Sequence, residues 1–164
     1  MQEGRKKLNQ AGMSLLELVV VILIIGILAV GSAVGINYAS QMNSTSAAEK
    51  LSSMLERTRL YTISADDTVK LVLSKEGDHY YGKIMKGSSE VDKVSLGSQA
   101  LTITIKEEGQ ADITVATGDE YEFSYKKENG AFTDTCTYSS VVITGGAKTR
   151  TVQLVHATGR CYLE

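Results

Sequence analysis

The sequence contains no proline, no tryptophan, and only two histidines and two cysteines among its 164 residues. Neither His79 nor His156 has a second histidine or a cysteine at the spacing that metal sites use. The chain also lacks a nucleophile elbow, a phosphate-binding glycine loop and the zinc-binding H-E-x-x-H motif. These absences predict a protein that has no metal or cofactor and is not an enzyme.

The composition is close to that of an ordinary globular chain, with 43% hydrophobic and 22% charged residues. It indicates neither a disordered protein nor one with many membrane segments. The formal net charge is −2, although Arg5, Lys6 and Lys7 make the N-terminus basic. Because the remainder is acidic, a generally basic nucleic-acid-binding protein is excluded.

One long apolar run stands out near the N-terminus. No charged residue occurs between Leu18 and Ile36, and a helix of that length spans roughly 28 Å, close to the thickness of a bilayer core. The run is too long for a cleavable secretory signal peptide. The basic residues before it place the N-terminus in the cytoplasm and the C-terminal domain outside. A plain signal anchor is one interpretation.

A carboxylate, Glu17, lies at the start of this run. A charged group in the bilayer costs a few kcal/mol and indicates a function or a partner. Near the edge of the membrane, Glu17 could simply extend to the headgroups. Alternatively, if the chain were cut after Gly12, the new α-amino group of Met13 could pair with Glu17 of a neighbouring chain, which would serve assembly.

The stretch G-M-S-L-L-E-L, Gly12 to Leu18, follows a short basic leader and precedes a long apolar helix. It resembles the processing site of type IV prepilins and type II secretion pseudopilins. The resemblance implies that a prepilin peptidase cleaves after Gly12 and N-methylates Met13, and that Glu17 acts in filament assembly. It also implies other pilin or pseudopilin subunits, a platform protein and an assembly ATPase as partners.

The residues after the apolar run predict a continuous amphipathic helix from Asn37 to Ser64. Its expected packing stripe consists of Ala47, Leu51, Met54, Leu55, Thr58 and Tyr61. No proline interrupts the two helical segments, so the membrane helix is expected to run directly into this extension. The stretch Ser64–Thr68 predicts the turn that ends it.

The last hundred residues alternate in the manner of short strands separated by glycine-containing turns. The expected strands are Val69–Leu73, His79–Met85, Leu101–Lys106, Ala111–Ala116, Tyr121–Lys126, Ser140–Gly145 and Thr149–Val155. The pair Gly145-Gly146 predicts a hairpin between the last two. We therefore predict an α+β fold, with a long N-terminal helix packed on an antiparallel sheet.

The expected domain organisation follows from these segments. It comprises a prepilin leader (1–12), a transmembrane and filament-core helix (13–36), an amphipathic helix extension (37–64) and a β-rich external domain (65–164).

Cys136 and Cys161 would close a loop of 26 residues. In an oxidising exterior such a disulfide would contribute roughly 3.5 kcal/mol, and disulfides near the C-terminus are frequent in pilins. The sequence predicts this bond, with two separate buried thiols as the alternative.

The ending Thr158-Gly159-Arg160 resembles minor pseudopilins of the H type, and the missing proline distinguishes the chain from many major pilins. Some minor pilins of this lineage bind DNA, which would here depend on Lys148, Arg150 and Arg160. The terminal residue is Glu164, and so few basic residues argue against nucleic acid. A pilin-like subunit is therefore preferred to a DNA-uptake pilin and to a plain signal-anchored domain.

Overall fold

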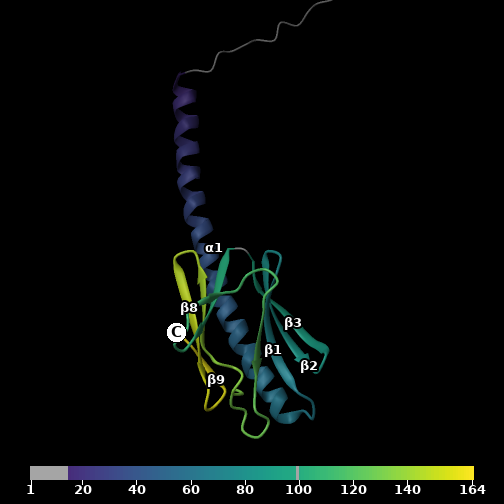
Figure 1. Cartoon of the computed structure of the whole chain (residues 1–164). Coiled ribbons are helices and arrows are strands. Elements are labelled where there is room, and N and C mark those ends of the chain that lie inside the picture. Colours follow the sequence, from purple (N-terminus) through teal and green to yellow (C-terminus); the bar gives the residue numbers. More distant parts are fainter. Residues whose placement is uncertain (1–14, 99) are drawn as a thin grey trace, which may run out of the picture. The chain divides into compact units, whose positions relative to one another are not determined.

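The computed structural model describes residues 15–98 and 100–164, with the side chains of 27–42 excepted. Within these residues, a long helix is followed by strands (Figure 1). The elements are α1 (Leu15–Ser64), β1 (Val69–Glu76), β2 (His79–Lys86), β3 (Ser89–Gly97), β4 (Leu101–Glu107), β5 (Ile113–Thr114), β6 (Glu120–Ser124), β7 (Tyr138–Gly145), β8 (Lys148–Val155) and β9 (Arg160–Leu163). The predicted α+β class is confirmed.

The chain divides into two units between Ile36 and Asn37. The division falls within α1, so the second unit contains the C-terminal half of the helix together with all the strands. All the strands and the core cluster belong to this second unit.

The strands form two sheets, where the sequence had predicted one. The first has the order β3-β2-β1-β6 and the second the order β5-β4-β7-β8-β9, and all pairings are antiparallel. Short turns connect the hairpins. The β7–β8 hairpin predicted at Gly145-Gly146 is confirmed, and Gly146 has φ 60°, a left-handed conformation that favours glycine.

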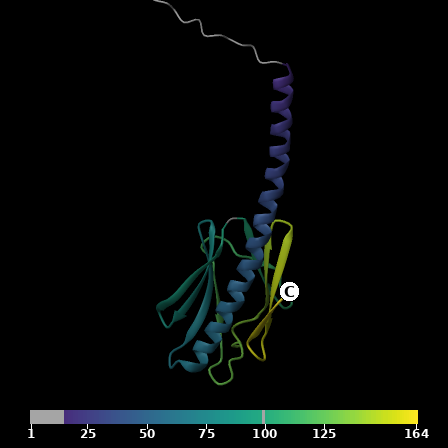
Figure 2. The same cartoon turned by 180° about the vertical axis from the view of Figure 1, so that it is seen from behind.

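The core of this unit is shared between the helix and both sheets. Seen from behind, the C-terminal half of α1 lies across the domain, with strands to both sides (Figure 2). The helix contributes Ala47, Ala48, Leu51, Met54 and Leu55 to the core cluster. Side chains of the first sheet in the same cluster include Leu71, Ile84 and Phe123, and those of the second include Ile103, Val141 and Leu154.

The predicted packing stripe of the helix is confirmed except at its last member. Tyr61 is 40% exposed, and the Arg57 guanidinium lies over its ring at 6.0 Å from the centroid. The neighbouring Thr62 is buried instead, and its single hydroxyl hydrogen is shared between the carbonyl oxygens of Thr58 (2.9 Å) and Val69 (3.3 Å). A threonine can occupy this core position because those two carbonyls satisfy its hydroxyl.

Polar contacts attach the helix to one strand of each sheet. On one side, Arg57 pairs with Asp92 of β3 at 2.9 Å. On the other side, the Ser52 hydroxyl lies 3.3 Å from the thiol of Cys161 in β9. The helix is therefore held between the two sheets by polar contacts as well as by its apolar face.

Two strands were not predicted, and a third is shorter than expected. In β3, almost every side chain is exposed or half-buried, so the strand has no apolar alternation to detect. The four residues of β9 are also mostly exposed. Only Ile113–Thr114 of the predicted segment 111–116 pairs as a strand, because β5 contacts β4 through just two residue pairs.

Candidate functional site

The N-terminal motif can be placed only in part. Gly12 and Met13, the predicted cleavage and methylation positions, lie outside the described residues. Glu17 lies in the first turn of α1 and is exposed. A carboxylate in that turn interacts favourably with the positive end of the helix dipole.

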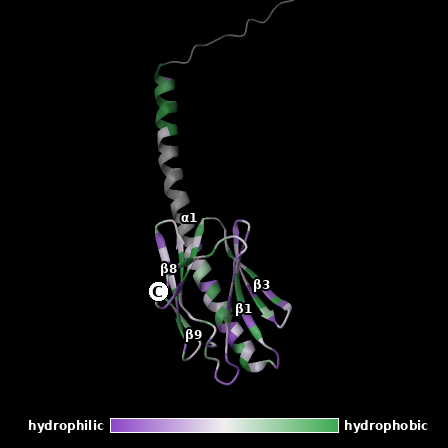
Figure 3. Cartoon of the chain, in the orientation of Figure 1, coloured by the Kyte–Doolittle hydropathy of each residue, from purple (hydrophilic) through white to green (hydrophobic). Residues whose placement is uncertain are grey.

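The first three turns of α1 expose large apolar side chains on every side. Exposure ranges from 39% at Val21 to 81% at Leu15. Hydropathy colouring shows this start of the helix as the longest continuous hydrophobic stretch of the described chain (Figure 3). A helix that is apolar all round is stable only when lipid or protein surrounds it. This segment therefore requires a covering that the isolated chain does not provide.

Across the part of the chain whose side chains are described, no helix combines the length and the apolar character needed to cross a membrane. The predicted transmembrane segment, 13–36, includes residues that lie outside that part.

The predicted disulfide is not formed, and both cysteines are free thiols. Cys136 precedes β7 and is buried in the core cluster, whereas Cys161 faces α1 from β9 and interacts with the hydroxyl and carbonyl of Ser52. Burial raises the pKa of Cys136 to about 11 and also raises the pKa of Cys161. The structure therefore corrects the disulfide prediction: the two thiols are separate, with Cys136 buried and Cys161 partly exposed.

Alkylation shows directly whether Cys136 and Cys161 are free thiols or form a disulfide. In native conditions at neutral pH, Cys136 should react slowly with iodoacetamide because its thiol is buried and burial raises its pKa. The partly exposed Cys161 should react faster than Cys136, although its pKa is also raised by burial. In urea without reductant, mass spectrometry should find both cysteines alkylated. An unfolded chain that takes up no carbamidomethyl group would instead show that the disulfide exists.

Arg59 of α1 connects the helix to two loops of the β-rich region. Its Nε–H is shared between the carbonyl oxygens of Gly130 (3.0 Å) and Thr158 (3.1 Å). The guanidinium also lies 3.8 Å from Glu56, one turn earlier on the helix. Hydrogen bonds from a charged donor are stronger than neutral ones, so Arg59 fixes both loops against the helix.

The same two loops touch through their backbones at Gly159 and Gly130. Gly159 has φ +64°, and a Cβ atom there would overlap the Gly130 carbonyl oxygen. The residue is therefore required to be glycine for two reasons, its left-handed backbone and the closeness of the facing loop. This gives Thr158-Gly159-Arg160 a structural role in the present chain.

The three residues proposed for DNA contact do not form one patch. Lys148 begins β8, and Arg160 pairs with Val155 at the other end of that strand, roughly 23 Å away at the usual rise per residue. Arg150, between them, contacts the Thr45 hydroxyl of α1 at 3.4 Å. A basic groove for nucleic acid would need these groups on one continuous surface.

A hollow of about 640 Å³ lies among the loops around Glu107, Lys126, Phe132 and His156. Nε2 of His156 is 2.7 Å from the Tyr138 carbonyl oxygen, so this nitrogen is already engaged. Within residues 15–98 and 100–164, no three histidine, cysteine, aspartate or glutamate side chains are grouped to hold a metal ion. The hollow therefore offers no arrangement that identifies a reaction.

Comparison with known proteins addresses the N-terminal segment. The family model of the prokaryotic N-terminal methylation motif matches residues 7–33, which include Gly12, Met13 and Glu17. The match supports the resemblance to type IV pilins and pseudopilins, and it does not reach the Thr158–Arg160 ending on which the H-type resemblance depends. No curated protein and no solved structure was found to match the chain.

Proposed function

We propose that this chain is a structural subunit of a filament of the type II secretion or type IV pilus kind. The observation that carries the proposal is the methylation motif at residues 7–33, within which the first turns of α1 expose apolar side chains on all sides. A prepilin peptidase cleaves after Gly12, and Met13 becomes the methylated N-terminus. Residues 13–36 first anchor the subunit in the membrane and then form the filament core.

The exposed apolar start of α1 explains why assembly would be favourable. In the membrane, lipid covers Leu15, Leu16 and the apolar side chains after them, and in a filament the helices of other subunits replace the lipid. Glu17 favours the filament over the lipid, because a carboxylate in an apolar core needs a cationic partner. The methylated α-amino group of Met13 on an adjacent subunit supplies one.

The domain organisation proposed from the sequence remains part of this proposal. Residues 1–12 are the leader, 13–36 the anchor and core helix, 37–64 its extension, and 65–164 the external domain. The N-terminus lies in the cytoplasm before processing. A platform protein and an assembly ATPase move the subunit out of the membrane, and the Thr158-Gly159-Arg160 ending favours a minor, H-type subunit.

Substitution of Glu17 tests the assembly role. We expect Glu17→Leu to insert and to be cleaved normally, because the change makes the segment more apolar, but to be absent from sheared filaments. Glu17→Asp is the matched control and should retain assembly, since it keeps the carboxylate. Immunoblots of membrane and filament fractions measure both variants.

A plain signal anchor predicts a different result. In that case no filament fraction contains the wild-type chain, and Glu17→Leu behaves as wild type or inserts better. Filaments that incorporate the Glu17→Leu variant as well as wild type would contradict the proposed role of this carboxylate.

A further inference from the structure

The loop between β6 and β7 contains the pair Asn129-Gly130. The sequence has four asparagines, and only Asn129 is followed by glycine. Asparagine is among the chemically labile residues of proteins. A following glycine increases this lability, because a residue without a Cβ atom leaves its backbone nitrogen unshielded and free to turn toward the asparagine side chain. Asn129 is also exposed, so water reaches it. The pair therefore has the chemistry for spontaneous deamidation.

Deamidation at this pair takes place in two steps. First, the backbone nitrogen of Gly130 attacks the side-chain carbonyl carbon of Asn129, loses its proton and expels the side-chain nitrogen as ammonia, which leaves a cyclic succinimide. Water then opens the ring at either carbonyl group, giving aspartate or isoaspartate. One water molecule is consumed and one ammonia is released, so the reaction requires no other reagent.

In the folded chain, both reacting groups are already engaged. The Gly130 N–H donates a hydrogen bond to the Lys126 carbonyl oxygen at 2.8 Å, a contact typical of a left-handed glycine that ends a turn. The side-chain oxygen of Asn129 accepts a hydrogen bond from the Ala131 N–H at 3.0 Å. The ring can close only after the nitrogen gives up the first bond and the side chain leaves the second. Deamidation in the native state therefore requires a local opening of the loop.

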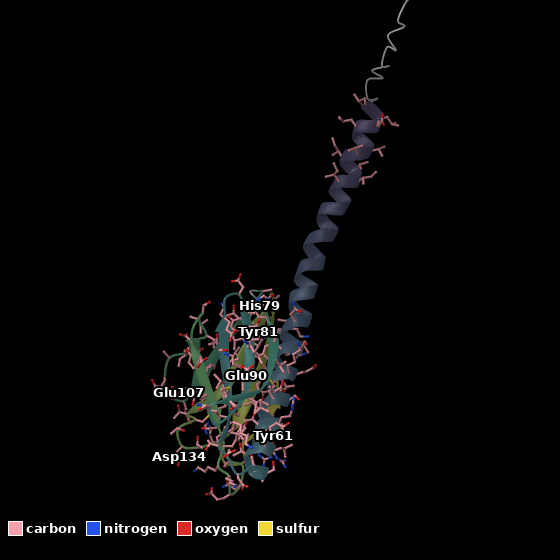
Figure 4. All side chains as sticks on the ribbon, turned by 90° about the vertical axis from the view of Figure 1, so that its right-hand side faces the viewer. Tyr61, His79, Tyr81, Glu90, Glu107 and Asp134 are labelled. Carbon is pink, nitrogen blue, oxygen red and sulfur yellow. The ribbon has the colours of Figure 1, made fainter. Side chains whose placement is uncertain are left out.

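The loop is also closed at its base. The Lys126 N–H donates a hydrogen bond to the Ala131 carbonyl oxygen at 2.7 Å. The Lys126 ammonium group pairs with Asp134 at 2.8 Å, and Asp134 lies toward the same end of the domain as Tyr61 of α1 (Figure 4). This ion pair is exposed and contributes little, so the backbone hydrogen bonds provide most of the restraint within the loop.

Arg59 holds the same loop against the helix. Its Nε–H is shared between the carbonyl oxygens of Gly130 and Thr158, and hydrogen bonds from a charged donor are stronger than neutral ones. Gly130 is thus held through its N–H by its own loop and through its carbonyl oxygen by α1. Loss of the guanidinium would free the carbonyl side of Gly130 and make the loop easier to open.

The isoaspartyl product would not fit this arrangement. In isoaspartate the main chain runs through the side-chain carbons, so the backbone between positions 129 and 130 becomes one carbon longer. The added length displaces the Gly130 carbonyl group, which accepts the Arg59 hydrogen bond and leaves no room for even a Cβ atom at Gly159. Modification of Asn129 would therefore break the contact between the two loops and the helix.

We propose that Asn129-Gly130 is a site of spontaneous deamidation that the Arg59 contact suppresses in the folded chain, and that conversion to isoaspartate releases the two loops from α1. The site is independent of the filament role, because every group in it belongs to the second unit of a single chain. A chemical change at one side chain is thereby converted into a loss of stability of that unit.

Mass spectrometry of the full chain, incubated in detergent at mildly alkaline pH with and without urea, tests the site. In the tryptic peptide 128–148, Asn129 has the only side-chain amide, so an increase of about 1 Da reports deamidation there. We expect the peptide from folded wild type to change about tenfold or more slowly than that from the urea sample, because the loop has to open first. In urea, Asn129→Gln should abolish the increase.

A variant of Arg59 tests the suppression. Arg59→Met keeps an aliphatic stem but has no donor, and in the folded state it should deamidate several-fold faster than wild type. The matched control is Asp66→Ala, which removes the exposed ion pair with Lys127 of the same loop and should leave the rate unchanged. Circular dichroism checks that both variants are folded. The comparison of wild type with and without urea needs no variant.

The effect of the product is measured on the isoaspartyl chain, separated by chromatography from an aged sample. Its Tm should be several degrees below that of the unmodified chain. Asn129→Asp, which has the new charge without the longer backbone, should have a Tm close to that of wild type.

Four results would overturn the proposal. Absence of a mass increase in urea would show that the site does not react. Equal rates with and without urea would show that the fold does not suppress the reaction. A folded Arg59→Met that deamidates at the wild-type rate would remove the role of Arg59. An isoaspartyl chain with an unchanged Tm would show that the product leaves the loops in place.

Discussion

Replacement of Gly159 by alanine is expected to destabilise the folded domain by about 3–5 kcal/mol. The left-handed backbone at φ +64° costs a residue with a Cβ atom about 1–2 kcal/mol. The larger part comes from the overlap of that Cβ with the Gly130 carbonyl oxygen, which forces the two loops apart and strains the hydrogen bonds that Arg59 donates to them. Thermal unfolding of the full chain in detergent should show a fall in Tm on the order of 10 °C.

Gly77→Ala is the matched control for this prediction. Gly77 has nearly the same backbone conformation, φ +58°, but no atom within 4 Å of an added Cβ. Its substitution should therefore cost only the conformational part, about 1–2 kcal/mol. Equal losses of stability at Gly77 and Gly159 would contradict the close approach of the two loops.

The second large effect is expected at Leu51 in the C-terminal half of α1. Leu51 is fully buried in the core cluster between the helix and the sheets, so Leu51→Ala should leave a cavity and cost about 2–5 kcal/mol of unfolding free energy. Urea unfolding, monitored by circular dichroism, measures the change. The variant tests directly whether this half of the helix packs on the β-rich region.

Leu60→Ala provides the comparison on the same helix. Leu60 is 57% exposed in the isolated chain, and its truncation should change stability by no more than about 0.5 kcal/mol. If the Leu51 and Leu60 variants lost similar amounts of stability, the assignment of the buried face would be wrong.

The sequence predicts the helical part of the fold because the pattern there is strong. The turn predicted at Ser64–Thr68 agrees with the observed end of α1 at Ser64, and five of the six positions in the predicted stripe are buried. The sixth position, Tyr61, fits the helical spacing of the apolar residues but is exposed. Thr62 is buried in its place, because two carbonyl oxygens lie within hydrogen-bond distance of its hydroxyl. Hydrophobicity alone does not reveal such partners.

The edge strands and the division of the strands into two sheets were harder to predict. An edge strand such as β3 pairs through its backbone while its side chains remain polar, so no alternation reveals it. The division of the strands into two sheets depends on which strands pair, and β6 joins β1 although some fifty residues separate them in sequence. Pairing over that separation is set by packing around the helix.

Of the residues in the candidate site, some could be predicted from the sequence and others could not. The motif around Gly12 and Glu17 is local, so residue types and spacing were enough to indicate it, and the family model matches the same segment. By contrast, Arg59 acts on backbone carbonyls that are 71 and 99 residues away in sequence. The disulfide prediction rested on the presence of two cysteines, which says nothing about the geometry between them.

The proposed function requires that this chain is processed and assembled as a pilin-like subunit. Intact mass and N-terminal sequencing of the protein purified from its native membranes test it most directly. We predict a chain that begins at Met13 and has one additional methyl group. A chain that still begins at Met1, from cells with an active prepilin peptidase, would contradict the proposal and leave a plain membrane-anchored domain.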